Sequence, residues 1–157
     1  MPSHDPSDIP STAAILGHPI HPMLIPFPIA FLVGALVSDL IFTANQDVFW
    51  ARAALWLTAA GLVFGVVAAL FGAIDFFTIG RVRAFRIAWV HFIGNAVVLI
   101  LALISVLMRA NNPEAAVQPW GLVLSLMISL ILVVTGWLGG ELSYRHKVGV
   151  NSKPENS

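Results

Sequence analysis

The chain has 157 residues, of which 58% are hydrophobic and 10% are charged, and its mean hydropathy of +0.87 is far above that of a soluble globular domain. A formal net charge of zero without a basic stripe argues against nucleic-acid binding, and the lack of cysteine excludes disulfides, thiolate metal sites, c-type haem attachment and cysteine-ligated iron–sulfur clusters within this chain. The composition therefore predicts an integral membrane protein whose surroundings are the lipid bilayer.

The two ends of the chain are polar. Residues 1–16, MPSHDPSDIPSTAAIL, contain no Lys or Arg and no cleavable apolar region, so we expect a short polar tail and not a signal peptide. A transmembrane domain over residues 17–145 follows, and residues 146–157 are predicted to form a polar C-terminal tail. His4 and His146 are expected to be exposed in these tails.

Four apolar stretches are long enough to cross a bilayer, which requires about 20 residues in a helix. Short connections make successive helices antiparallel neighbours, so the sequence predicts an all-α, up-down-up-down four-helix membrane bundle. Small residues at four-residue spacing in the second stretch predict close helix packing. The predicted spans are 23–44, 53–79, 87–108 and 120–138, and the small residues are Gly61, Gly65, Ala69 and Ala73.

The basic residues predict the orientation of the bundle. Six of them lie in the second connection and after the fourth span, whereas two lie on the opposite side, so the positive-inside rule predicts that both termini are cytoplasmic. The six are Arg81, Arg83, Arg86, Arg145, Lys147 and Lys153, and the two are Arg52 and Arg109.

The first span begins with two histidines that each precede a proline, in the segment GHPIHPMLIPFPIAF. Prolines restrict the backbone on both sides of the peptide bond that they form, so they stiffen this segment and fix the direction of the His18 and His21 imidazoles. A fixed imidazole suits a ligand, although interfacial histidines often contact only headgroups and water.

Four ionisable residues are predicted to lie in one layer on the cytoplasmic side of the membrane, and such groups are costly there unless they pair, bind a ligand or line a wet cavity. They are His21, Asp75, His91 and Glu141. Asp39, nearer the other face, is expected to bond a neighbouring helix or to pair with Arg52 or Arg109.

A short internal repeat relates the two halves of the chain. HPIHP and AWVHF begin the first and third spans, and FGAID and WLGGE end the second and fourth. Two helix pairs related by a pseudo-two-fold axis along the membrane normal would bring His21 opposite His91 and Asp75 opposite Glu141.

The motifs GHPIHPMLIPFP, SDL, GAIDF and LGGELSYRHKVGV, together with the histidine that opens the third span, resemble a bacterial transmembrane family known as domain of unknown function 2231. The resemblance covers residues 17–150 and implies four spans in the bacterial inner membrane, without an established activity. It also implies an electron-transfer setting, because similar domains look to be joined in some proteins to Rieske-type or cytochrome domains. Lys147 departs from the glycine expected at its position.

Two chemistries suit the histidines and acids. In the first, the protein is a cytochrome-like electron-transfer subunit in which His21 and His91 ligate a b-type haem near the cytoplasmic face, Gly94 leaves room for the macrocycle, and a redox protein or a quinone is the partner. In the second, carboxylates join imidazoles around an Fe, Mn or Zn ion. The ligands of that second site are His21 or His18, His91, Asp75 and Glu141.

A third hypothesis has no cofactor. The polar layer then holds together a non-catalytic membrane anchor or structural subunit, which includes the possibility of a homo-oligomer. The sequence does not decide whether the protein is an enzyme.

Overall fold

Helices long and apolar enough to cross a membrane make up most of the chain, and four such candidate spans occur in the part that the structure describes. The structure is a computed structural model, and it describes residues 7–150. The spans are Ile20–Asn45, Val48–Thr78, Arg86–Arg109 and Pro113–Tyr144. Three of them contain a predicted apolar stretch in full, and the second ends one residue before the predicted stretch 53–79 does, so the prediction of four helices able to span a membrane is confirmed.

Two of the spans consist of more than one helical segment. The first joins α1 (Ile20–Leu24) to α2 (Pro26–Asn45), where prolines at 26 and 28 remove amide donors from the opening turn of α2. The last joins α6 (Pro113–Ala116), η1 (Val117–Gly121) and α7 (Leu122–Tyr144), with extended backbone at Gln118. The second and third spans are α3 (Val48–Thr78) and α5 (Arg86–Arg109), linked by the short α4 (Gly80–Arg83).

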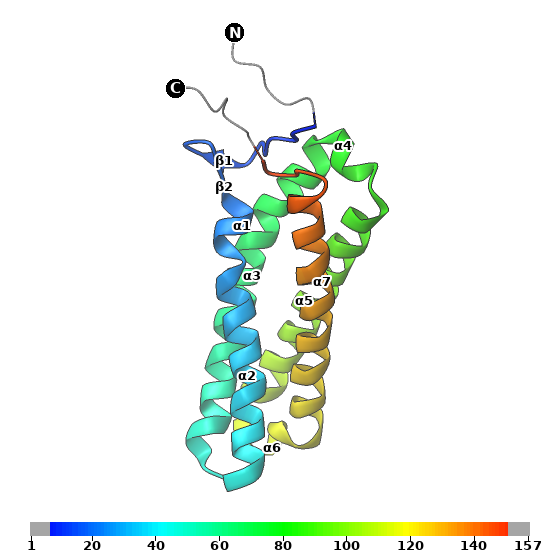
Figure 1. The fold of residues 1–157 in the computed structure, drawn as a ribbon. Coiled ribbons are helices and arrows are strands. Elements are labelled where there is room, and N and C mark those ends of the chain that lie inside the picture. The colour runs from blue at the N-terminus through cyan, green and yellow to red at the C-terminus, as the bar shows by residue number, and fades with distance from the viewer. Residues whose placement is uncertain (1–6, 151–157) are drawn as a thin grey trace.

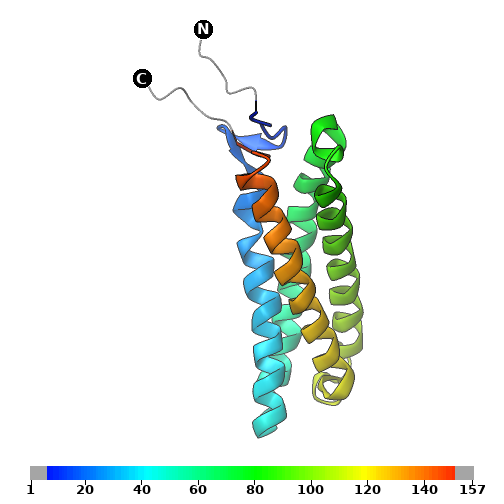
Figure 2. The same ribbon diagram turned by 45° about the vertical axis from the view of Figure 1, so that its right-hand side comes forward.

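The four spans form an up-down-up-down bundle, as the short connections predicted (Figures 1 and 2). α2 packs against α3 and α7, and α5 packs against the same two helices, so α2 and α5 occupy diagonal corners. The central core consists of Leu32, Val98, Ala102, Ile128 and Leu132.

Glycines of the predicted small-residue seam allow α3 to approach its neighbours. A Cβ on Gly61 would lie 2.6 Å from a carbon of Leu32 in α2, and a Cβ on Gly65 would lie 2.7 Å from a carbon of Leu99 in α5. Both distances are too short for real atoms, so these two positions serve helix packing as predicted.

The two ends of the described chain meet over one end of the bundle. Ile9 is 2% exposed and forms a parallel bridge with Val148, through hydrogen bonds to the Lys147 carbonyl at 3.1 Å and from the Gly149 amide at 2.8 Å. Within the described residues, the segments predicted to be polar tails are packed against this end of the bundle, from residue 8 in the first segment and up to residue 150 in the second. The physical reason is the apolar Ile9 side chain, which joins the core cluster at this end.

A short hairpin connects this N-terminal segment to α1. Its strands are β1 (Ala14–Ile15) and β2 (His18–Pro19), and its turn residues Leu16 and Gly17 have φ angles of 51° and 80°. The turn is closed by a hydrogen bond from His18 Nδ1 to the Leu16 carbonyl at 3.1 Å.

Candidate functional site

Two of the predicted site residues, His21 and His91, come together inside the bundle. Their ring centroids lie 6.2 Å apart and their planes are nearly perpendicular, at 84°. His21 belongs to α1 and His91 to the first turns of α5, so the rings extend toward each other from diagonal corners. We call these two residues the histidine pair.

The main chain fixes both imidazoles in the same way. His21 Nδ1 lies 2.8 Å from the Ala68 carbonyl oxygen on α3, and His91 Nδ1 lies 2.8 Å from the Thr135 carbonyl oxygen on α7. A carbonyl only accepts, so each Nδ1 carries the proton and donates it. In the neutral ring this leaves the Nε2 lone pair for a ligand, the arrangement typical of metal-bound histidines.

A glycine one turn beyond each carbonyl makes room for the ring. A Cβ on Gly72 would lie 2.9 Å from His21 Nδ1, and a Cβ on Gly139 would lie 3.0 Å from His91 Cε1. A side chain at Gly72 would force the His21 ring to shift, and one at Gly139 would crowd the His91 ring. Neither glycine was predicted to be a site residue, although they lie in the repeated motifs FGAID and WLGGE.

The histidine pair lies between two cavities. The larger, of about 370 Å³, extends toward the end of the bundle that the terminal segments cover, and the smaller, of about 100 Å³, extends toward the centre. Both are lined by His21, His91 and Asn95, and otherwise mainly by apolar side chains. Ala69 and Ala73, predicted as packing residues, line the larger cavity, so the second half of the small-residue seam provides space for it.

Asp75 lines the same cavity, but its carboxylate binds the N-terminal segment. Oδ1 accepts hydrogen bonds from the amides of Thr12 and Ala13 at 2.8 and 3.0 Å and from the Thr12 hydroxyl at 2.9 Å, and Oδ2 accepts one from the Ser11 hydroxyl at 2.6 Å. These four hydrogen bonds pair the Asp75 carboxylate without any ligand in the cavity. A polar group near the membrane surface needs such partners, and here the N-terminal segment provides them, which helical periodicity could not predict.

The other predicted ligands also lie apart from the histidine pair. Glu141 forms an ion pair at 2.8 Å with Arg145 one turn later, and His18 is exposed in the hairpin. Between residues 7 and 150, no group of three or more His, Asp or Glu side chains is arranged to hold a metal ion. The predicted layer therefore divides into a histidine pair and two acids with separate partners.

Gly94 does not leave space beside His91. A Cβ at this position would lie 2.5 Å from the Thr135 methyl carbon, so the glycine allows α5 and α7 to pack closely. Sequence spacing placed Gly94 one turn from His91, but the side of the helix that it faces is filled by α7.

His146 also differs from the prediction of an exposed tail residue. Its ring lies 4.2 Å, centroid to centroid, from the ring of Phe85, and it is half-buried. The terminal segment folds back over the bundle, which brings the imidazole onto this aromatic surface. His4 and Lys153 lie outside the described residues.

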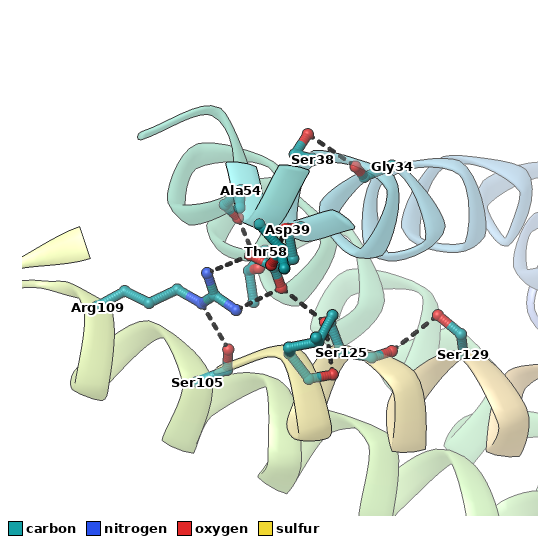
Figure 3. Close-up of polar contacts among 11 residues, drawn as sticks. Gly34, Ser38, Asp39, Ala54, Thr58, Ser105, Arg109, Ser125 and Ser129 are labelled. Carbon is teal, nitrogen blue, oxygen red and sulfur yellow. Dashed lines mark hydrogen bonds and ion pairs between the residues drawn. The ribbon is translucent and has the colours of Figure 1, made fainter. Parts of the chain in front are cut away.

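A second polar pair lies near the opposite end of the bundle (Figure 3). Arg109 Nη1 and Nη2 donate to the two carboxylate oxygens of Asp39, both at 2.7 Å, and both side chains are 0% exposed. The Ser125 hydroxyl donates to Asp39 at 2.7 Å, and Arg109 Nε donates to the Ser105 hydroxyl at 3.0 Å. The predicted pairing of Asp39 with a basic residue is confirmed, and Arg109 is the partner.

The two pairs are related by the internal repeat. Asp39 and Arg109 are 70 residues apart, and His21 and His91 have the same separation. Each pair thus joins equivalent positions of the two halves, as a pseudo-two-fold axis between α2 and α5 requires. Aligning Gly72 with Gly139 matches Asp75 to residue 142, one position beyond the predicted match to Glu141.

The fold and the site define a class: a four-span helical membrane protein with a paired-histidine cavity near one end. The chain belongs to the family described as Predicted membrane protein (DUF2231), whose model matches residues 17–152. This match confirms the resemblance seen in the motifs. Comparison with curated proteins and with solved structures finds no match.

Proposed function

We propose that the protein is a b-type cytochrome-like electron-transfer subunit that holds a haem between His21 and His91. The observation that carries this proposal is the pair of imidazoles, each fixed through Nδ1 to a main-chain carbonyl at 2.8 Å, with ring centroids 6.2 Å apart. Two imidazoles bound through nitrogen at about 2 Å on opposite sides of one iron have centroids about 6 Å apart, so the spacing fits the group.

The number of protein ligands favours haem over a bare metal ion. A haem takes four nitrogens from its own macrocycle and needs only two from the protein, whereas protein sites for zinc usually supply three or four side chains. Two histidines without an adjacent acid match the first requirement. The metal-ion alternative would need ligands in addition to His21 and His91, and the carboxylates of Asp75 and Glu141 already have other partners.

The cavities also suit a flat apolar ligand. The larger one, at about 370 Å³, is within the range of about 300–1,000 Å³ typical of cofactor and ligand pockets, and apolar side chains line most of it. A disc that passed between the rings would extend into both cavities. Two histidine ligands would leave no open position on the iron for a substrate, which suits electron exchange with a redox protein or a quinone.

The test is a reduced-minus-oxidised absorption spectrum of the purified protein, with metal analysis of the same sample. We expect a b-type haem spectrum that is lost in His21→Ala and in His91→Ala and retained in the matched control His18→Ala, whose ring is exposed in the hairpin. Metal without a haem spectrum would support the ion alternative. A protein with neither would overturn both and favour the non-catalytic anchor.

A further inference from the structure

We propose that the tip of the β1–β2 hairpin, formed by Ile15 and Leu16, inserts into the headgroup layer of the same bilayer that the helices span. The tip is apolar and exposed: Ile15 is 62% exposed and Leu16 is 94% exposed within the protein. In Figure 1 the hairpin lies beyond the N-terminal end of α1, and its tip extends past the side of the bundle.

The exposed tip comes shortly before apolar, exposed side chains of the first span in the sequence. Met23 in α1 is 60% exposed and Phe27 at the start of α2 is 46% exposed, in a helix apolar enough to cross the membrane. Leu16 and Ile15 add exposed apolar side chains just before this helix begins. The occupant of such a surface is the interfacial region of the membrane, which accommodates apolar side chains at helix ends.

The length of the first span places the tip at the depth of the headgroups. The span from Ile20 to Asn45 has 26 residues, whereas the hydrocarbon core needs about 20, so about six residues, or roughly 9 Å, extend beyond it and are shared by the two ends. β2 ends at Pro19, directly before the span. The tip is therefore within the headgroup layer, which is about 5–8 Å thick on each side.

The two-residue turn of the hairpin requires a positive φ at both Leu16 and Gly17, and Leu16 adopts a φ of 51° although this region favours glycine or asparagine. The turn leaves the Leu16 side chain as the most exposed large apolar side chain of the described residues. The interfacial region of the membrane would bury it.

The anchor has a consequence for the histidine pair. Because β2 continues into α1 at Ile20, a tip held among the headgroups fixes the depth of the helix end that carries His21. This inference does not depend on which ligand the histidines bind, so its failure would leave the haem proposal standing.

A single introduced cysteine tests the proposal, because the chain has none of its own. We would attach an environment-sensitive fluorophore to Leu16→Cys and, separately, to Ile15→Cys in the full chain reconstituted into phosphatidylcholine and phosphatidylglycerol vesicles. Pro10→Cys is the matched control, since Pro10 is exposed in the same N-terminal segment but outside the hairpin.

We expect blue-shifted emission at both tip positions, and about two-fold quenching by lipids brominated close to the headgroup, with little change at the control position. Water-like emission without lipid quenching at Leu16→Cys and Ile15→Cys would overturn the proposal. A blue shift that brominated lipids do not quench would also overturn it, and would point to contact with a second copy of the chain.

Discussion

Each of the two polar pairs at opposite ends of the bundle joins equivalent positions of the internal repeat, but the two pairs have opposite properties. Asp39 and Arg109 are oppositely charged, fully buried and fully hydrogen-bonded. His21 and His91 are alike, half-buried and next to cavities, and their hydrogen bonds use only Nδ1. A closed pair holds helices together, whereas an open pair with a free nitrogen on each ring can bind a ligand.

This difference shows how one repeat supports two tasks. At one end the two equivalent positions carry opposite charges and form a structural clamp, because buried charges of opposite sign attract each other strongly where water is absent. At the other end both equivalent positions carry histidine, which gives a symmetric pair of imidazoles. The predictions below test whether the two ends are in fact separable in this way.

The largest expected effect comes from Arg109→Met. It leaves the Asp39 carboxylate buried without its charge partner, which destabilises a protein by about 3–5 kcal/mol. Thermal unfolding in detergent, followed by circular dichroism, measures the loss. The matched control is Arg52→Met on the same side of the membrane, where the side chain is exposed and a change within about 0.5 kcal/mol is expected.

The double variant Asp39→Leu with Arg109→Met sharpens this result. Removing both charges and keeping similar volume should restore most of the stability lost in Arg109→Met, because well-packed apolar residues replace buried ion pairs at little cost. If the double variant is as unstable as the single one, the pair serves geometry that apolar residues do not reproduce.

A smaller effect, confined to the other end, is expected from Gly139→Ala. The new methyl group would lie 3.0 Å from His91 Cε1, and overpacking of this kind costs about 1–3 kcal/mol and turns the ring away from Thr135. The matched control is Gly34→Ala in α2, which lines neither cavity and where a Cβ would make only ordinary contacts, at 3.5 and 3.9 Å from carbons of Leu57. Ligand retention should fall in Gly139→Ala only; equal retention in both would contradict the assigned role of the glycine.

The two acids at the same end of the bundle as the histidine pair, Asp75 and Glu141, should differ in what they stabilise. Asp75→Ala removes four hydrogen bonds from the N-terminal segment, so exchange of the Thr12 and Ala13 amides should become about tenfold faster, which corresponds to about 1.4 kcal/mol. Glu141→Ala loses only an ion pair one turn away in the helix, worth about 0.3–0.5 kcal/mol.

Hydrogen exchange measured by mass spectrometry distinguishes the two variants. Metal or haem loss in Asp75→Ala with unchanged exchange of the N-terminal segment would instead return this acid to the ligand set.

The orientation of the bundle in the membrane does not affect its internal contacts or its stability. It determines which of the two ends faces the cytoplasm. Arg109 is buried in its ion pair, so among the basic residues of the opposite side within the described chain only Arg52, near the start of α3, remains as an exposed charge. A thiol reagent that does not cross membranes should label Gly80→Cys only from the cytoplasmic side and Asn111→Cys only from the other. The reverse pattern would place the histidine pair at the outer face.

Some features of the site followed directly from residue types and spacing. Asp39 required a partner because an isolated charge in a membrane is costly, and Arg109 was one of two basic residues near enough. His21 and His91 begin the first and third spans, and short connections place those spans on a diagonal. The motifs that resemble the family predicted the same four spans.

Other features depended on the rotation and axial shift of one helix against another. A period of 3.6 residues determines which side chains share a face of their own helix, but not which neighbour that face meets. The Ala68 and Thr135 carbonyls, the glycines that receive the imidazoles, and the loss of Gly94 to packing were therefore beyond sequence reasoning.

By itself the sequence determined the membrane class, the four spans and the need of each polar residue for a partner, because these depend on apolar length and on the cost of burying charge. Only the tertiary structure determined which residues are the partners of these polar groups. Asp75 binds residues more than 60 positions away, and the two histidines bind carbonyls 47 and 44 positions away. Such pairings arise when packing brings helices and terminal segments to one place, and packing depends on the shapes of all four helices together.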